Sequence, residues 1–259
     1  MDIQILVAMH KPYWAPLDET YLPLQVGALG KPSLHISNYP AAYQIQRDDE
    51  GFHISGRNPD FCELTGLYWA WKNSRADYVG SVHYRRYFVR KERPFFISGH
   101  REDILTKDEW VDLLSDVPIV LPKKRHYYIE SVASHYRHAH DAVSWQVVGD
   151  ILEKMYPAYS PCFADLDKRR SAHLFNMFVM RKDYFDQYCT WLFAVLFSLE
   201  KKLPQHEPRL FGFLAERLLD VWIDTNRLPY TEVPVAFMER RNWGKKIGQF
   251  LWRKMRKGK

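Results

Sequence analysis

Two clusters of basic and aromatic residues could bind a phosphorylated ligand. His10 and Lys11 directly follow the apolar run Ile3–Met9. His83–Arg86 directly follow a second apolar run, Tyr78–Val82. Both runs predict buried strands, and open parallel sheets bind ligands at the carboxyl ends of their strands. Three or four cations there would suit a diphosphate, because a guanidinium gives phosphate two parallel hydrogen bonds. Alternatively, the two arginines only pair with acidic residues at the edge of the sheet.

Two carboxylates within apolar helical segments are candidate general bases. Glu63 lies in an expected helix over residues 61–73, and Glu216 lies in an expected helix over residues 210–223. Acidic residues in such places either pair with Arg or have a raised pKa and act in proton transfer. Arg217 follows Glu216 directly, so a plain ion pair on the helix is an equally good interpretation of that residue.

Two patterns could indicate a metal, and for both we favour an interpretation without one. His135, His138 and His140 lie near His126, but their spacing on a helix does not place all three on one face. Asp165–Asp167 match the DxD letters that hold a metal in many sugar-nucleotide transferases. They follow no buried strand and run into a basic stretch, which favours a solvated loop. We therefore expect no metal cofactor.

The elements that position these residues alternate between strands and helices. This alternation predicts an α/β fold with a mostly parallel, Rossmann-like sheet flanked by helices. The chain contains no GxGxxG or GxxxxGK(S/T) motif, which removes the best evidence for a dinucleotide-binding fold or a P-loop. A capping box at Thr106–Glu109 starts one helix. Further strands are expected at 117–121, 175–180 and 231–238, and further helices at 130–155 with a break near Asp141, at 183–199 and at 210–223.

The composition is that of an ordinary soluble globular protein, because 46% of the 259 residues are hydrophobic and 26% are charged. The three cysteines stand in no CxxC spacing, which argues for a reducing compartment and against a structural zinc site. The apolar run near the N-terminus is too short for a signal peptide, and no apolar window is long enough for a membrane span. We therefore expect a cytoplasmic protein.

The positive charge gathers in the segment 239–259. This segment carries nine Lys and Arg and one Glu, although the net charge of the whole chain is only +6. An amphipathic basic helix of this kind binds the interface of an anionic membrane, and a solvated, frayed terminus is the alternative. A nucleic-acid-binding protein would carry its basic face on the folded domain, so we expect no nucleic acid partner. The apolar side of the helix would consist of Trp243, Ile247, Phe250, Leu251 and Met255, with Trp252 off that side.

Several longer motifs resemble one family. They are YLPLQVGALGK at 21–31, NPDFCELTGLYWAWKN at 58–73, DYVGSVHYRRYF at 77–88, LPKKRHYYIESVASHYRHAH at 121–140, FNMFVMRKDYFDQYCTWLF at 175–193 and FGFLAERLL at 211–219. With them the chain resembles the small bacterial polysaccharide-biosynthesis glycosyltransferases long catalogued only as a domain of unknown function. Galactofuranosyltransferases of O-antigen and capsule assembly belong to this family.

The resemblance implies a GT-A-like domain over residues 1–238, and the tail at 239–259, which its own pattern predicts to associate with a membrane, follows this domain. It implies inverting transfer of a sugar, with galactofuranose as the expected one, from a UDP-sugar to a lipid-linked glycan at the inner face of the cytoplasmic membrane. His83–Arg86 stand where a GT-A enzyme normally places DxD, so protein cations would neutralise the leaving diphosphate without a metal. A non-catalytic nucleotide-sugar or glycan binding protein of the same fold is the alternative.

The resemblance also implies roles for individual residues. Glu216 is the expected catalytic base, and Glu63 is the alternative. The family pattern has an Asp about one turn after His140, where this chain has Ser144, and Asp141 is the candidate substitute. Acceptor binding is expected of His135, Tyr136, His140 and Arg217. Nucleotide-sugar binding is expected of His10, Lys11, His83, Tyr84, Arg85, Arg86 and Asn176.

Overall fold

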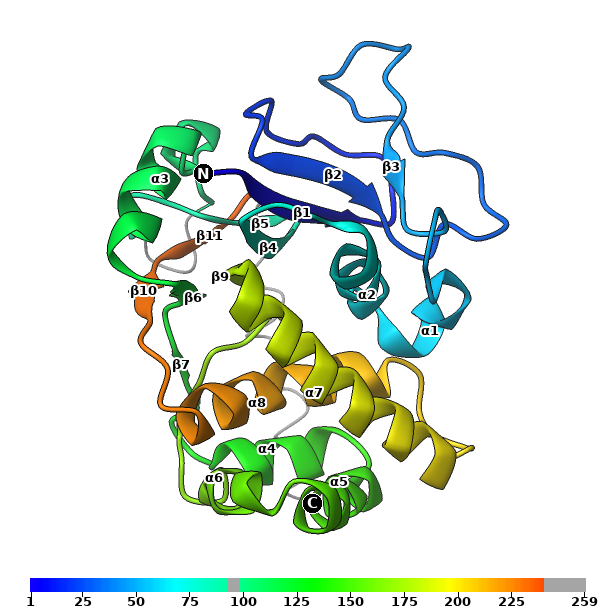
Figure 1. The fold of residues 1–259 in the computed structure, drawn as a ribbon, viewed down its shortest axis with the longest axis vertical. Helices are drawn as coiled ribbons and strands as arrows, with labels where there is room; N and C mark the ends of the chain where they lie inside the picture. Colours follow the sequence, from blue (N-terminus) through cyan, green and yellow to red (C-terminus); the bar gives the residue numbers. More distant parts are fainter. Residues whose placement is uncertain (93–97, 240–259) are drawn as a thin grey trace, which may run out of the picture.

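A mixed β-sheet lies at the centre of the molecule (Figure 1). The computed structural model describes residues 1–92 and 98–239. Within these ranges the strand order is β10-β6-β9-β4-β1-β2-β3, and β5 and β11 form an antiparallel extension attached to β4. The strands are β1 (Ile3–Met9), β2 (Tyr21–Gln25), β3 (Gln46–Arg47), β4 (Tyr78–His83), β5 (Arg86–Phe88), β6 (Ile119–Pro122), β9 (Phe178–Arg181), β10 (Thr231–Val233) and β11 (Val235–Phe237).

The sheet is mostly parallel, which confirms the prediction from the alternating elements. Strands β4, β1, β2 and β3 run parallel to one another, and β10 runs parallel to β6. Strand β9 is antiparallel to both β4 and β6. In the register of β1 with β4, Ala8 pairs with His83, so the two strands end at the same edge of the sheet. The side chains that follow these strands therefore emerge close together.

Helices cover both faces of the sheet. On one face α2 (Leu64–Asn73), α7 (Lys182–Lys202) and α8 (Leu210–Thr225) share a core with sheet residues such as Leu6 and Val79. On the other face α3 (Lys107–Asp116) packs Trp110 against the side of β1 that carries Ile5. The remaining elements are α1 (Asn58–Phe61), α4 (Val132–Ala139), α5 (Ala142–Met155), α6 (Ser160–Asp165), the short strands β7 (Arg125–His126) and β8 (Ser171–Ala172), and 3₁₀ turns at Ser55–Arg57, Arg101–Asp103 and Pro157–Tyr159. Helices α4, α5 and α6 form a further layer against α7 and α8 (Figure 1).

Two predicted elements are interrupted or shortened where the backbone is left-handed. The expected helix at 61–73 is broken at Cys62, which has a φ of 51°, so the segment forms α1 and α2 instead. The expected strand at 175–180 begins three residues late, because Phe175 and Asn176 have φ values of 81° and 51°. Such angles cost a non-glycine residue about 1–3 kcal/mol and are found preferentially at functional sites.

The other predicted elements agree with the structure to within a few residues. The capping box is formed, because the Glu109 carboxylate accepts the Thr106 backbone N–H at 2.8 Å. The predicted break near Asp141 is also confirmed, since its carboxylate caps α5 by accepting a backbone N–H at 2.9 Å. The expected strand at 231–238 is divided into β10 and β11.

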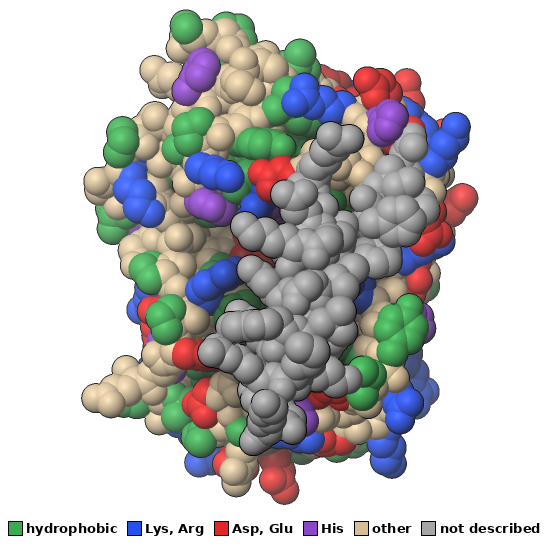
Figure 2. Space-filling model, turned by 180° about the vertical axis from the view of Figure 1, so that it is seen from behind, with side chains coloured by type: hydrophobic (Ala, Val, Ile, Leu, Met, Phe, Trp, Pro, Cys, Tyr) green, Lys and Arg blue, Asp and Glu red, His purple; other side chains and the backbone are tan. Residues whose placement is uncertain are grey.

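The basic tail lies outside the described residues, apart from Glu239, so its helix and its membrane contact remain predictions. None of the described helices is long and apolar enough to cross a membrane. In the described part of the face drawn in Figure 2, Lys and Arg side chains are interspersed with acidic and apolar ones and form no continuous stripe.

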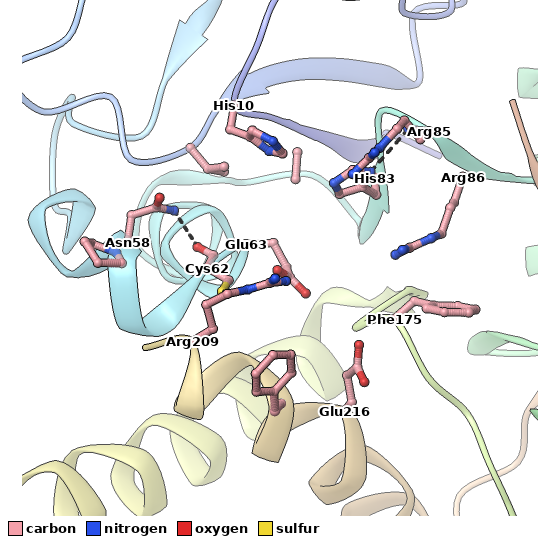
Figure 3. A pocket seen from close by; sticks show the side chains of 14 residues that line it. His10, Asn58, Cys62, Glu63, His83, Arg85, Arg86, Phe175, Arg209 and Glu216 are labelled. Atoms are coloured by element: carbon pink, nitrogen blue, oxygen red, sulfur yellow. Dashed lines mark hydrogen bonds between the residues drawn. The ribbon is translucent and has the colours of Figure 1, made fainter. Parts of the chain in front are cut away.

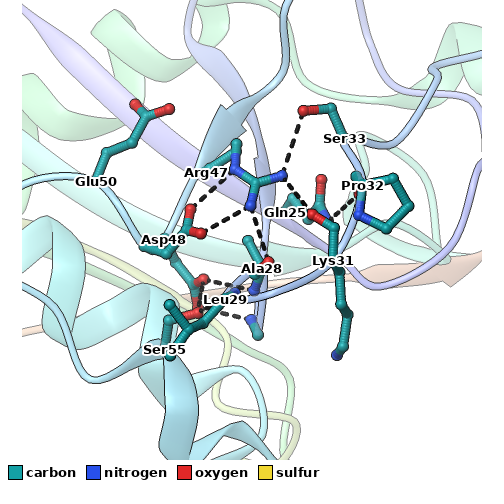
Figure 4. Close-up of polar contacts among 12 residues, drawn as sticks. Gln25, Ala28, Leu29, Lys31, Pro32, Ser33, Arg47, Asp48, Glu50 and Ser55 are labelled. Carbon is teal, nitrogen blue, oxygen red and sulfur yellow. Dashed lines mark hydrogen bonds and ion pairs between the residues drawn. The ribbon is translucent and has the colours of Figure 1, made fainter.

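A buried carboxylate fixes the chain after β2 (Figure 4). Asp48 is fully buried and accepts the backbone N–H groups of Gly27 and Ala28 at 2.8 and 2.9 Å. It also accepts the hydroxyls of Ser55 and Thr65. Gly27 has a φ of 62°, and a Cβ there would lie 2.4 Å from the Asn58 side chain, so only glycine fits. This network therefore sets the position of Asn58, at the start of α1.

Replacing Asp48 with Ala is expected to lower the free energy of unfolding by at least about 3 kcal/mol, because four buried donors lose their acceptor and each such loss costs about 1–3 kcal/mol. Urea denaturation measures the change. Glu50→Ala is the matched control, since this exposed carboxylate accepts a hydrogen bond from the Gln46 side chain at the surface, and its loss should cost about 1 kcal/mol or less. Equal effects of the two substitutions would contradict the structural role assigned to Asp48.

Candidate functional site

A cavity of about 560 Å³ opens at the carboxyl ends of β1 and β4 (Figure 3). Open parallel sheets bind their ligands at this position. The structure brings together the two clusters that follow the strands and the two carboxylates expected on helices. The predicted residues that line the cavity are His10, Glu63, His83, Arg85, Arg86 and Glu216.

Arginines from two parts of the chain make the cavity basic. Arg85 and Arg86 follow β4, and Arg209 lies at the start of α8. The guanidinium carbon of Arg86 is 4.5 Å from the ring centroid of Phe175, a cation–π contact that holds it at the cavity wall. Figure 3 shows the Arg86 side chain directed toward the side of the hollow where Glu216 lies. The cavity can therefore bind an anion at its arginines, with the Glu216 carboxylate placed across from that anion.

The surroundings of His10 and His83 favour their neutral forms. Burial lowers the pKa of His83 to about 2, and the neighbouring Arg86 and Arg85 act in the same direction. Burial also lowers the pKa of His10, and Arg85 adds to that effect. The Nδ1 atom of His83 accepts the backbone N–H of Arg85 at 3.3 Å, which leaves Nε2 as the protonated nitrogen. The two imidazoles can therefore hydrogen-bond to a ligand, but the positive charge comes from arginines.

Lys11 and Tyr84 lie beside the cavity. The Lys11 side chain is exposed, and its Nζ is 3.8 Å from the carboxylate of Glu239. That carboxylate also accepts a hydrogen bond from Arg85 at 3.2 Å. The Tyr84 ring is fully buried, with its centroid 5.3 and 4.3 Å from the two imidazoles. Tyr84 thus positions the histidines, and Lys11 contributes to the charge outside the cavity wall.

Glu216 is a partly buried carboxylate whose protonation is favoured by its surroundings. Burial is the largest cause that raises the pKa of Glu216, and the nearby Glu63 raises it further, whereas Arg217 and Arg86 act in the opposite direction. Its Oε2 accepts a hydrogen bond from Arg217 at 2.7 Å, so the ion pair expected on the helix is also present. A carboxylate with a pKa shifted toward neutrality is suited to accept a proton from a substrate hydroxyl.

The second carboxylate is held by the left-handed segment that precedes β9. The Asn176 side-chain amide donates to Oε1 of Glu63 at 2.7 Å and to the carbonyl of Gly212 at 3.1 Å. The backbone of the preceding Phe175 hydrogen-bonds to Glu216, where it opposes the rise in pKa. Phe175 and Asn176, the two residues with left-handed backbone, thus hydrogen-bond to Glu216 and Glu63 respectively. Asn176 positions Glu63 and is not among the described residues that line the cavity.

The four residues expected to bind the acceptor lie behind the cavity wall and are not among the described residues that line it. The His140 ring stacks on Phe213, which lines the cavity, with centroids 4.1 Å apart. His135 packs on Tyr127, and Arg217 pairs with Glu216. Tyr136 is fully buried in the core. These residues support the wall near Glu216, and their predicted contact with the acceptor remains a proposal.

Ser144 does not present a carboxylate-like group to the cavity. It is fully buried, donates to the carbonyl of Asp141 at 2.6 Å and hydrogen-bonds to the Tyr136 hydroxyl at 3.0 Å. The carboxylate of Asp141 caps α5. The Asp141 carboxylate is therefore used to cap this helix, and its role as the substitute for the family's Asp remains a prediction.

Arg209 is the main cavity residue that the sequence patterns do not single out. It has a left-handed φ of 68°, and its Nε donates to the sulfur of Cys62 at 3.4 Å. Its charge contributes to the lowered pKa of both histidines, so it faces the two strand ends. The local sequence carries no signal for it, because Arg209 precedes α8 and its left-handed backbone depends on the folded structure.

The patterns that could indicate a metal make other contacts. The carboxylates of Asp165 and Asp167 are exposed and pair with Arg169 and Arg137 at 3.1 and 2.6 Å. His138 pairs with a glutamate of the preceding loop. Within residues 1–92 and 98–239, no group of three or more His, Cys, Asp or Glu side chains could hold a metal ion. The DxD letters therefore mark a solvated, ion-paired turn.

Comparison with solved structures identifies the fold as a glycosyltransferase fold. The chain is similar to the apo structure of the WbbM bifunctional glycosyltransferase, with a TM-score of 0.83 and 30% sequence identity. The match covers 92% of this chain, which spans 46% of the length of that structure. No curated protein matches the chain.

Residues 4–227 match the model of a family described as a domain of unknown function, DUF4422, and the chain belongs to this family. The match covers the sheet apart from β10 and β11, together with the cavity and the helices around it. The predicted family resemblance and the predicted fold class are therefore confirmed.

Proposed function

We propose that the protein is an inverting glycosyltransferase of bacterial surface polysaccharide synthesis. It transfers a sugar from a UDP-sugar to a lipid-linked glycan at the inner face of the cytoplasmic membrane. The observation that carries the proposal is the cavity at the strand ends, where a carboxylate with a raised pKa lies across from arginines. Galactofuranose as the transferred sugar rests on the family resemblance alone.

The proposed reaction is a single displacement in which each group has a separate task. The Glu216 carboxylate accepts the proton of the acceptor hydroxyl, and the acceptor oxygen forms a bond to the anomeric carbon as the bond from that carbon to UDP breaks. Negative charge then develops on the leaving diphosphate. Arg85, Arg86 and Arg209 supply fixed positive charge for it, which stabilises the transition state more than the ground state.

The alternative is a non-catalytic protein that binds a nucleotide sugar or a glycan with the same fold. The basic wall alone is compatible with both functions, since either would bind a diphosphate. Glu216 favours the enzyme. A carboxylate in the cavity does not help to bind an anionic ligand, whereas a carboxylate with a raised pKa is suited to proton transfer.

A thermal-shift panel of nucleotide sugars, with and without EDTA, tests the donor class and the need for a metal together. We expect UDP-sugars to raise the melting temperature equally in both conditions, because protein cations neutralise the diphosphate. Stabilisation that EDTA abolishes, or stabilisation by none of the UDP-sugars, would contradict the proposal.

The pH dependence of turnover is expected to report the environment of Glu216. The base acts in its ionised form, so turnover falls as the pH drops through its pKa. Because the pKa of Glu216 is raised, the acid limb should lie above 4.5, the ordinary value for Glu. Glu63→Gln removes a negative neighbour that raises this pKa, so the limb should move to lower pH.

Asp60→Asn is the control for this shift, because Asp60 lies on the adjacent α1 and outside the cavity wall. Its acid limb should coincide with that of the unmodified protein. A limb that stays in place in Glu63→Gln, or one that moves upward, would show that Glu216 is not the titrating base.

A further inference from the structure

The loop that leads from β6 to α4 carries the two most exposed large apolar side chains of the described residues. Tyr128 is 88% exposed and Ile129 is 81% exposed, and they are neighbours in the chain. Single exposed apolar side chains are common on soluble proteins. Two adjacent apolar side chains that are almost fully exposed to water form a small apolar patch, and patches of this kind mark interaction sites. Residues 123–131 are called the basic-aromatic loop below.

The fold holds these two side chains outward. Strand β7, within the loop, pairs with β8. The backbone N–H of Tyr127 donates to the carbonyl of Arg170 at 2.7 Å, and that of Val132 donates to the carbonyl of Arg169 at 2.8 Å. The Ser131 side chain caps α4. Because both ends of the loop are tied to the same neighbouring segment, the exposure of the apolar pair is built into the structure.

Two exposed arginines lie close to the apolar pair. Arg125 precedes Tyr128 in the loop, and Arg170 lies beside the loop, where its carbonyl accepts the backbone N–H of Tyr127. Lys123 is also exposed but pairs with Glu92. In the part of the chain that the structure describes, Arg125 and Arg170 form no ion pair with an acidic side chain. The acidic residue of the loop, Glu130, is already bound by a histidine of α4 at 2.8 Å. The positive charge next to the apolar pair is therefore available to an external anion.

The basic-aromatic loop begins beside the cavity. The guanidinium carbon of Arg125 is 5.4 Å from the ring centroid of Phe175, which lines the cavity. Burial raises the pKa of Tyr127, Arg217 lowers it and Glu216 raises it. Tyr127 therefore lies near both Arg217 and Glu216. A surface that binds the loop would therefore lie close to the cavity.

We propose that the basic-aromatic loop docks on the surface of an anionic lipid bilayer. Tyr128 and Ile129 enter the boundary between headgroups and acyl chains, and Arg125 and Arg170 meet the lipid phosphates. An aromatic side chain with a polar end and a neighbouring aliphatic one are suited to this depth, and cations near the surface add electrostatic attraction. This contact is separate from the one expected of the tail at 239–259.

A bilayer fits the loop better than a protein partner does. Stable protein interfaces bury about 800 Å² on each partner, far more than two adjacent side chains supply. A bilayer needs only a few inserted apolar groups with cations beside them. Docking does not depend on the proposed function; only its consequence, that the cavity lies near a lipid-linked acceptor, rests on that function.

Cosedimentation of the 259-residue chain with vesicles tests the proposal. The vesicles contain phosphatidylcholine with phosphatidylglycerol, or phosphatidylcholine alone, at low salt. We expect binding to the anionic vesicles, and we expect Tyr128→Ser/Ile129→Ser to lower the partition coefficient by roughly tenfold or more, because both inserted side chains are lost. Both positions are exposed, so the fold should be unaffected. The matched control is Leu17→Ser/Phe52→Ser, two other exposed apolar positions, which should bind as the unmodified chain does.

Unchanged binding of Tyr128→Ser/Ile129→Ser would overturn the proposal, since any membrane contact would then lie elsewhere, for example in the tail. An equal loss in the control would overturn it as well, because the effect would not be specific to the loop. Turnover on a water-soluble acceptor provides the separate readout. The loop variant should retain it, so a failure of docking and a failure of the proposed function give different results.

Discussion

Replacement of Glu216 with Gln is expected to lower turnover by about 10²–10⁴-fold, the usual contribution of a general base. The substitution keeps the size of the side chain, and the amide oxygen can still accept the hydrogen bond from Arg217 that the carboxylate accepts at 2.7 Å. Donor affinity should be retained, because the cations that face the diphosphate are unchanged. Steady-state kinetics and calorimetric titration with the donor measure the two quantities on the same preparation.

Glu200→Gln is the matched control for this substitution, since Glu200 is an ion-paired carboxylate on α7, outside the cavity. It should leave turnover unchanged. The other carboxylate in the cavity provides the contrasting result. If Glu216→Gln remained active while Glu63→Gln lost turnover with its fold intact, Glu63 would be the base and the assignment would be reversed.

Arg85→Ala is expected to lower donor affinity or kcat/KM at least tenfold. Hydrogen bonds to a charged group contribute about 1.5–3 kcal/mol, and the cavity gives the diphosphate only a few arginines to pair with. In the free protein the Arg85 guanidinium is 3.2 Å from the Glu239 carboxylate, which the diphosphate would have to replace. The remaining arginines should preserve part of the affinity.

The control for Arg85→Ala is Arg101→Ala, an exposed arginine stacked on Trp14 at 4.4 Å and outside the cavity wall. Loss of the Arg101 side chain should not change the kinetics. Unchanged kinetics in Arg85→Ala would contradict the role given to the basic wall. Full inhibition of the unmodified protein by EDTA would do so too, since a metal would then carry that role.

The strand ends and the carboxylates of the cavity could be predicted from the sequence because they follow from local patterns. A buried apolar run predicts a strand, and the residues after it must emerge at the edge of the sheet. His10, His83, Arg85 and Arg86 were found in this way. Glu63 and Glu216 were found because an acidic residue within an apolar helix is unusual.

The rest of the cavity depends on contacts between distant segments that no local pattern contains. The left-handed backbone of Cys62 and Arg209 brings the Arg209 guanidinium to the cavity, and neither residue type favours that conformation. The neutral state of His83 follows from its burial among cations, which sequence neighbours alone do not reveal. Similarly, Tyr84 looks like a ligand-binding residue by its position, yet the packing places its ring in the core.

The most direct test of the central claim is acceptor-dependent release of UDP from UDP-galactofuranose by the 259-residue chain in the presence of EDTA. The acceptor is a polyprenyl-linked glycan, and the anomeric configuration of the product is read by NMR. We predict that UDP appears only when the acceptor is present, that Glu216→Gln abolishes its release, and that the new glycosidic bond has the inverted configuration. Tight binding of the donor without release of UDP under any acceptor condition would contradict the account and show a binding protein instead.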